Sequence, residues 1–210
     1  MKKIKLFDPV IGISEEREII KILRSGFWAS GSGSGKVQEF EKKFSKYLNS
    51  DQCVAVNSGT AALNLALSLL DIKNKEVILP SLSFVATAHA VTLNGGKPVF
   101  ADVDSETLCI DPKQIMKLIT KKTAAILPVH FAGIACNLNE ISQICQENNI
   151  KLIEDAAHAA GTKYDGRKIG SHSMAVCFSF HPVKNLGMPT GGLISINHVN
   201  HRKLKKTLNE

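Results

Sequence analysis

The sequence lacks any apolar run of the about 20 residues that a membrane-spanning helix needs. Its first residues, Met1–Lys5, are basic, but Asp8 and Pro9 follow where a secretory signal peptide would have an apolar segment. Aromatic residues make up only 6% of the chain, and no nucleic-acid-binding motif accompanies them. We therefore expect a protein without a membrane span, a signal peptide or a nucleic-acid partner.

Cysteine is scarce, and its arrangement argues against two kinds of site. The chain has five cysteines, an odd number, and no two of them form a C-x-x-C pair. A disulfide framework needs an even set, and a structural zinc site usually needs close pairs. We therefore expect free thiols in the cytoplasm, a reducing compartment, and no metal site. The five are Cys53, Cys109, Cys136, Cys145 and Cys177.

The remaining composition is that of an ordinary globular protein, with 44% hydrophobic and 21% charged residues among 210. This length suffices for one good core or two small ones. The formal charge is +7, of which the last ten residues contribute +4 − 1 = +3. A basic balance can mark a nucleic-acid partner or an acidic ligand. Without a motif, it favours a solvated lysine-rich face, and it also fits a phosphorylated small molecule.

Short apolar runs alternate with helical patterns along the chain. Strands are expected at residues 53–56, 77–79, 99–101, 124–127, 150–153, 175–180 and 193–196, and helices at 37–48, 61–70, 84–93, 111–119, 137–148 and 198–208. This alternation predicts an α/β domain with a mostly parallel sheet over residues 37–210. Residues 1–36 are expected to form an N-terminal arm and a glycine-rich loop.

Polar or aromatic residues follow three of the expected strands. Ser58-Gly59-Thr60 comes after the first strand, Phe84 after the second and Asp155 after the fifth. Ligands of parallel sheets gather beyond the C-terminal ends of the strands, so these residues are expected at one site. Glu154 precedes Asp155 directly and is expected to face the other side of the sheet.

Lys184 lies in the run FSFHPVKN, with Ser179 five residues before it and Gly191-Gly192 just after it. A lysine for a Schiff base, an aspartate for a pyridinium nitrogen and small polar residues for a phosphate are the groups that pyridoxal 5′-phosphate (PLP) chemistry requires. A single lysine is normally a surface residue. The combination with Asp155 and the glycines is what favours a cofactor site.

Each supporting residue also has an ordinary structural alternative. Ser58-Gly59-Thr60 can bind a phosphate at a helix N-terminus, or can simply cap the helix. Asp155 can hold a pyridinium nitrogen or cap the segment that follows it. His158 can contact the cofactor ring oxygen or Asp155, or be structural. Phe84 can stack on the ring or pack in the core. Ser179 can bind the phosphate or the backbone of its own strand.

Six segments together resemble a known family: VAVNSGTAAL, EVILPSLSFVATAHAV, KPVFADVDSETLCIDP, AAILPVHFAG, LIEDAAHAAGTKYDGRKIG and CFSFHPVKNLGMPTGGLIS. Through them the chain, from about Phe7 to Asn200, resembles the DegT/DnrJ/EryC1/StrS family of fold type I, PLP-dependent sugar aminotransferases. The resemblance implies a three-layer α/β/α sandwich. FSFHPVKN and the eight-residue step from Lys184 to Gly192 most resemble enzymes that make 4-amino-4-deoxy-arabinose or 4-amino-4,6-dideoxyhexose nucleotide sugars, which serve polysaccharide and lipopolysaccharide biosynthesis.

The resemblance also implies roles around PLP. Lys184 would be the catalytic lysine that forms the Schiff base, Asp155 would bind the pyridine nitrogen and Phe84 would stack on the ring. The remaining cofactor-binding residues are Gly59, Thr60 and Ser179 for the phosphate and His158 beside the ring. The implied activity is amino transfer, usually from glutamate, to a nucleotide-linked keto sugar by a homodimer whose active sites lie at the interface.

Two features depart from the family pattern. Members usually carry an acidic residue before the glycine pair, where this chain has Thr190. Members are also roughly twice as long, so a small C-terminal domain of about 100 to 150 residues is expected to be missing. The alternative function is therefore a truncated, non-catalytic remnant that retains the fold and binds PLP. PLP-dependent sugar dehydration is disfavoured because the lysine is retained.

Overall fold

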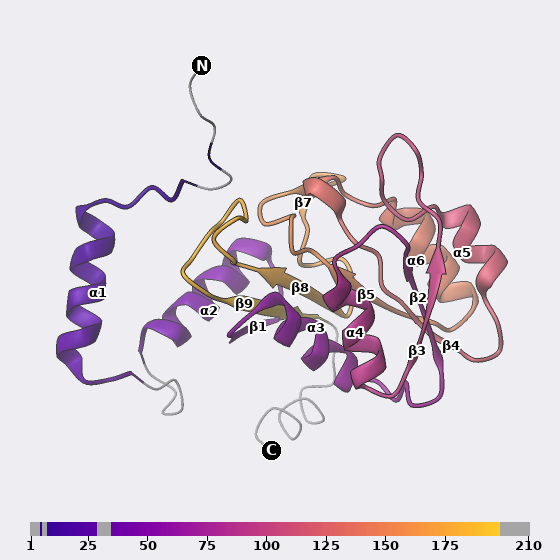
Figure 1. Ribbon diagram of the computed structural model, residues 1–210, viewed down its shortest axis with the longest axis horizontal. Coiled ribbons are helices and arrows are strands. Elements are labelled where there is room, and N and C mark those ends of the chain that lie inside the picture. Colours follow the sequence, from indigo (N-terminus) through magenta and orange to yellow (C-terminus); the bar gives the residue numbers. More distant parts are fainter. Residues whose placement is uncertain (1–4, 6–7, 29–34, 198–210) are drawn as a thin grey trace.

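A seven-stranded sheet forms the centre of the molecule. The computed structural model describes residues 5, 8–28 and 35–197, so the helix expected at residues 198–208 lies outside the described residues (Figure 1). The strands are β1 (Gln52–Val56), β2 (Glu76–Pro80), β3 (Lys97–Ala101), β4 (Thr123–Ile126), β5 (Lys151–Asp155), β8 (Ala175–Ser179) and β9 (Gly192–Ile196). Their order is β1-β9-β8-β5-β4-β2-β3, and within this sheet only β9 is antiparallel to its neighbours. The predicted α/β fold with a mostly parallel sheet is confirmed.

The central strands are continuous apolar runs because both of their faces are covered. In β2, Val77, Ile78 and Leu79 are all fully buried. Strands of parallel sheets read this way because helices pack on each side of the sheet. The same strand ends at Pro80, and the chain leaves the sheet there toward the cavity described below.

Helices cover both faces of the sheet and make a three-layer sandwich (Figure 1). One face carries α3 (Gly59–Ser68) and α4 (Val85–Leu93), which pack against a core that includes Ile153. The other face carries α2 (Lys36–Leu48), α5 (Pro112–Leu118) and α6 (Leu138–Glu147), whose core includes Leu152. Neighbouring residues of β5 thus belong to different layers, as strand alternation requires.

Side-chain caps fix where three of these helices begin. Ser58 accepts a hydrogen bond from the backbone of Ala61 at the start of α3, and Asp111 accepts one from Lys113 at the start of α5. Asn137 caps α6 in the same way. Each cap satisfies an N–H group that has no partner within the helix.

A short hairpin was not expected from the sequence. It joins β6 (Lys163–Tyr164) to β7 (Arg167–Lys168) through Asp165 and Gly166. Both turn residues have positive φ, 47° and 77°. This is the backbone of a two-residue hairpin turn, and Asp-Gly is the residue pair that favours it.

The first helix, α1 (Ile13–Ser25), stands apart from the sheet (Figure 1). None of its residues is buried, and Ile19 and Leu23 are 56% and 58% exposed. An ion pair of 2.8 Å joins its Glu18 to Lys36 of α2. The expected division between an arm at residues 1–36 and a domain at residues 37–210 stays a prediction.

Two further findings concern the described part of the chain. All five cysteines are buried free thiols, as expected. Among the described helices, none combines the length and the apolar character that crossing a bilayer would demand.

Candidate active site

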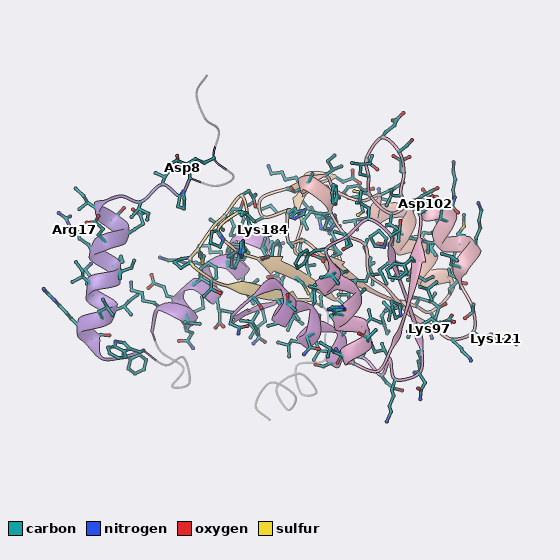
Figure 2. All side chains as sticks on the ribbon, viewed as in Figure 1. Asp8, Arg17, Lys97, Asp102, Lys121 and Lys184 are labelled. Atoms are coloured by element: carbon teal, nitrogen blue, oxygen red, sulfur yellow. The ribbon has the colours of Figure 1, made fainter. Side chains whose placement is uncertain are left out.

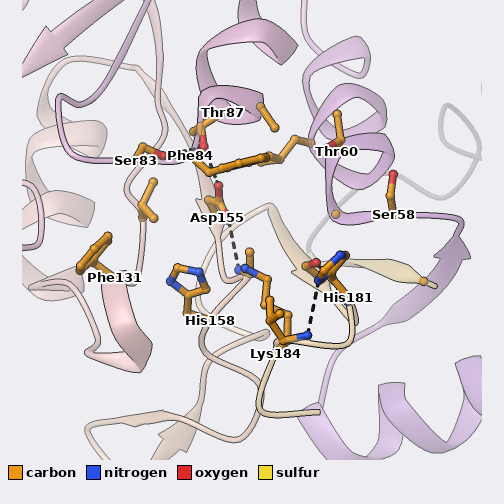
Figure 3. A pocket seen from close by; sticks show the side chains of 18 of the residues that line it. Ser58, Thr60, Ser83, Phe84, Thr87, Phe131, Asp155, His158, His181 and Lys184 are labelled. Carbon is orange, nitrogen blue, oxygen red and sulfur yellow. Dashed lines mark hydrogen bonds between the residues drawn. The ribbon is translucent and has the colours of Figure 1, made fainter. Parts of the chain in front are cut away.

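A cavity of about 380 Å³ lies beyond the C-terminal ends of β1, β5 and β8 (Figure 3). All seven residues that the sequence singles out line it: Gly59, Thr60, Phe84, Asp155, His158, Ser179 and Lys184. Asp155 and Ser179 end the neighbouring strands β5 and β8, and Gly59 and Thr60 begin α3 after β1. Phe84 precedes α4, and His158 and Lys184 lie in the loops after β5 and β8. The sheet therefore brings together residues that are up to 184 − 59 = 125 positions apart.

Asp155 forms the buried floor of the cavity, with an exposure of only 4%. Its Oδ2 accepts a hydrogen bond of 2.9 Å from the Thr87 hydroxyl, and its Oδ1 accepts one of 3.0 Å from the Ala157 N–H. Burial raises the pKa of the Asp155 carboxyl, and these two hydrogen bonds act in the opposite direction. The carboxylate forms no ion pair with any described residue, so its charge is available to a cationic ligand.

The start of α3 forms a backbone cradle at the cavity wall. The Ser58 side chain is used as the helix cap, with its Oγ 3.1 Å from the Ala61 nitrogen. Gly59 follows, and a Cβ at this position would lie only 2.7 Å from the Cβ of Ser179. A Cβ on Gly192 would collide with the Ser58 backbone even more severely. Glycine is thus required at both positions, and the first N–H groups of α3 lie beside Ser179, an arrangement suited to an anion.

Lys184 reaches the same cavity from the loop after β8 (Figure 3). Its backbone N–H donates to the His181 carbonyl at 2.8 Å, which shapes the loop. Its ammonium group has no hydrogen bond or ion pair with any described residue. Figure 2 shows Lys184 over the body of the molecule, whereas Lys121 lies at its right-hand edge. Burial lowers the pKa of Lys184, while the Asp155 carboxylate acts to raise it. The lowered pKa increases the fraction of neutral, nucleophilic amine.

His158 contacts the turn formed by Phe131 and Ala132. Its Nδ1 accepts a hydrogen bond of 3.3 Å from the Ala132 N–H, and its ring packs edge-on against Phe131 with 5.9 Å between centroids. Burial lowers the pKa of His158, and the nearby Lys184 charge lowers it further. A neutral ring whose Nδ1 is an acceptor carries its proton on Nε2.

Phe84 does not belong to the core. Phe84 is 73% exposed. It occupies the N-cap position of α4 and lines the cavity. The core-packing alternative for this side chain is therefore wrong. A large aromatic ring left open at a cavity rim is a feature of ligand or subunit contacts.

The sequence interpretation missed several residues of the site. The most informative is Thr87, which is fully buried and bonded to both Asp155 and Ser83, the latter at 2.6 Å between hydroxyl oxygens. A threonine three residues after Phe84, in the first turn of a helix that follows a strand, was the available signal. Thr190 also lines the cavity, and its hydroxyl donates to the Asn57 carbonyl at 2.8 Å.

The described residues contain no cluster of three or more His, Cys, Asp or Glu side chains suited to a metal ion. The chemical groups that the cavity brings together are a lysine, a buried carboxylate and a backbone cradle.

Comparison with known proteins gives concordant matches. A profile described as the DegT/DnrJ/EryC1/StrS aminotransferase family matches residues 9–209. The spore coat polysaccharide biosynthesis protein SpsC of Bacillus subtilis is 43% identical over 188 residues, which are 89% of this chain and 48% of that protein. The chain thus spans about half the length of the curated relatives it matches.

Solved structures show the same fold. An aminotransferase from Psychrobacter cryohalolentis is 32% identical, with a TM-score of 0.88, and the match covers 96% of this chain and 51% of that one. A Streptococcus pneumoniae protein that carries the name of a sugar aminotransferase, in its PLP form, is 30% identical with a TM-score of 0.93. That match covers 99% of this chain and 57% of the other.

Proposed function

This chain belongs to the DegT/DnrJ/EryC1/StrS aminotransferase family, and from that premise we propose that it binds PLP and transfers an amino group to a keto sugar. The observation that carries the proposal is the meeting of Lys184 and Asp155 in one cavity, next to the backbone cradle at Gly59. The amino donor we propose is glutamate, and the acceptor is a keto sugar linked to a nucleotide.

The residues present fit PLP at three points. A buried carboxylate without a cationic partner, Asp155, matches the protonated nitrogen of a pyridine ring. The cradle formed by Gly59, Thr60 and Ser179, where a Cβ on the glycine would collide, matches a phosphate. A lysine with a lowered pKa and no other partner among the described residues, Lys184, matches an aldehyde.

When bound, PLP supplies a covalent link to an amine and a cationic ring that accepts electrons. Lys184, as a neutral amine, would be the residue that holds the cofactor, and its Nζ would be the group that moves a proton. Asp155 keeps the ring nitrogen protonated, and Thr87 holds the Asp155 carboxylate in place. Phe84 would pack against the ring and exclude water from it. His158 would offer its Nε2–H as a hydrogen-bond donor to the cofactor.

The finer assignments rest on the relatives and on the cavity rim. The name of the Bacillus subtilis relative supports a role in polysaccharide biosynthesis. Phe84, an exposed apolar side chain at the rim, and the exposed Leu82 and Val85 close to it in the sequence support a homodimer whose interface closes the cavity. Five buried free thiols support a reducing, cytoplasmic location.

The first experiment is a titration of the purified chain with PLP. We expect an absorbance band at about 410–430 nm, which reports a covalent lysine link. The band should be lost in Lys184→Ala and kept in Lys121→Ala, a lysine at the periphery (Figure 2). Absence of the band in the native chain, or its persistence in Lys184→Ala, would contradict the assignment of the cofactor site.

The second experiment separates an enzyme from a remnant that keeps only cofactor binding. Purified chain, PLP, glutamate and a panel of nucleotide-linked 4-keto sugars are incubated together, and 2-oxoglutarate is measured. Amino transfer above that of Lys184→Ala supports the enzyme. A band without any turnover across the panel supports the remnant.

A further inference from the structure

A buried pair of ionisable side chains, His130 and Glu154, lies behind the cavity and has no part in the proposed reaction. Both side chains are completely buried, and His130 Nε2 is 2.8 Å from Glu154 Oε2. Glu154 lies one residue before Asp155 on β5 but faces the opposite layer of the sandwich, as strand alternation predicts. Ionisable side chains are costly to bury unless they are hydrogen-bonded. Buried hydrogen-bonded networks make the structure around them rigid.

The second nitrogen of the His130 ring is also occupied. The backbone N–H of Cys136 donates to His130 Nδ1 at 3.1 Å. Nδ1 therefore carries no proton, and the ring proton is on Nε2, from which it donates to Glu154. The His130 ring is thus fixed at both ends in a single orientation.

The backbone of His130 is tied directly to the strand that carries Asp155. The His130 N–H donates to the Asp155 carbonyl at 3.0 Å, and the Asp155 N–H donates to the Pro128 carbonyl at 2.9 Å. Val129, between them, lines the cavity. The buried pair therefore holds this segment against the end of β5 from the far side of the sheet.

A strained turn at Phe131–Gly133 follows immediately. Ala132 has φ 52° and ψ 20°, a left-handed conformation that is unfavourable for a residue with a side chain. Such a conformation persists where the surrounding structure enforces it. On one side it is held by His130, and on the other by the Thr162 hydroxyl, which donates to the Gly133 carbonyl at 2.8 Å. The Ala132 N–H points at Nδ1 of His158.

We propose that the Glu154–His130 pair is a positioning element for His158. By fixing the turn at residues 131–133, the pair directs the Ala132 N–H to His158 Nδ1 and so keeps the proton of that ring on Nε2, the nitrogen left for a ligand. Glu154 and His130 touch no ligand themselves and act only through the turn. The geometry of this chain carries the inference, and only the identity of the group that meets Nε2 rests on the proposed function.

The direct test is the tautomer of His158, measured by long-range 1H–15N NMR on the chain without cofactor. We expect one tautomer, with the proton on Nε2, in the native chain and in Glu154→Gln, whose amide oxygen still accepts from His130. In Glu154→Leu the acceptor is lost, and we expect loss of the single-tautomer signature of His158. Glu147→Leu, at an exposed position at the end of α6, should leave the signature unchanged.

A second variant keeps the test decisive if Glu154→Leu fails to fold. In His130→Asn the side-chain oxygen can still accept from the Cys136 N–H, but the bond to Glu154 is gone. We expect the same loss of the His158 signature. A folded Glu154→Leu or His130→Asn chain that retains a single Nε2–H tautomer would overturn the proposal.

A cofactor-dependent readout separates this proposal from the proposed function. With PLP present, the pH midpoint of the cofactor absorbance should shift in Glu154→Leu and stay at the native value in Glu154→Gln. If no PLP band forms in any variant, the proposed function fails, while the tautomer measurement on the cofactor-free chain still decides the positioning role. An unchanged midpoint in Glu154→Leu, with a normal PLP band, would count against the pair.

Discussion

Removal of the Thr87 hydroxyl is the most direct test of how the buried carboxylate is held. In Thr87→Val the side chain keeps nearly the same shape and loses only its polar atom. Thr87 is fully buried, and its hydroxyl donates to Asp155 Oδ2 at 2.9 Å. After the change Asp155 retains the Ala157 N–H at 3.0 Å as its remaining hydrogen-bond donor among the described residues.

The magnitude follows from the charge of the acceptor. A hydrogen bond to a charged group contributes about 1.5–3 kcal/mol, which is roughly a 10- to 150-fold change in the folding equilibrium. The sign depends on pH. Burial raises the pKa of Asp155 in the folded chain above 3.8, its ordinary value in the unfolded chain. The protonated carboxyl therefore contributes fully to stability below pH 3.8, and this contribution is lost as the pH rises through the pKa of the folded chain. The Thr87 hydrogen bond stabilises the charged form and limits this loss, so its removal should cost more at high pH than at low pH.

The assay is urea unfolding of the cofactor-free chain at about pH 8 and about pH 5, with midpoint and slope both measured. Thr92→Val on the same helix is the matched control, because its hydroxyl donates only to the His89 carbonyl at an exposed position. The control should change stability by less than about 0.5 kcal/mol. Equal stability of the two variants at pH 8, or a Thr87→Val cost that is the same at both pH values, would refute the reasoning.

Three other predictions concern the rim, the cradle and a thiol. Phe84→Ala should change the unfolding free energy by less than about 0.5 kcal/mol because the residue is 73% exposed, yet weaken PLP binding roughly 2- to 10-fold in an absorbance titration. Gly59→Ala should destabilise the chain by about 1–3 kcal/mol in urea because its Cβ would lie 2.7 Å from that of Ser179, and adding Ser179→Gly should restore much of the loss. The pKa of Cys109 is lowered to about 6, chiefly by a hydrogen bond with Cys136, so Cys136→Ala should raise the pH midpoint at which the buried Cys109 thiolate forms, as followed by the ultraviolet absorbance of the thiolate.

The position of the site was predictable because it follows from the direction of the strands. Asp155 follows one strand expected from the sequence and Ser58 follows another, so both were expected at the same edge of a parallel sheet. Lys184 joins them because β8 is the neighbour of β5, with Asp155 paired to Cys177. The roles of these residues toward PLP remain predictions.

The hydrogen bonds that hold the side chains of the site in place were not predictable in the same way. Thr87 and Asp155 are 68 residues apart, and His130 and Glu154 are 24 apart. Strand alternation indicated which way Glu154 faces, but it carries no information about the side chain that meets it. Such pairings depend on how separate strands and loops pack, which a local pattern does not encode.

The hairpin at Lys163–Lys168 was missed for a different reason. Its turn signal, Asp165-Gly166, was present in the sequence. Each of its strands has only two residues, however, which is too short to show alternation between apolar and polar positions. At this position the Asp-Gly turn pair is a stronger signal for a hairpin than the pattern of apolar residues.

The antiparallel strand β9 also sets the order in which the protein can be completed during synthesis. Within the described sheet β1 pairs only with β9, so its partners lie between 192 − 56 = 136 and 196 − 52 = 144 residues later in the chain. At about 5–20 residues per second, the ribosome needs roughly 7 to 28 s to make that stretch. Throughout this time the first strand has unpaired backbone groups, which is the state most open to chaperones and to aggregation. One of the first strands to be made is thus among the last to be paired.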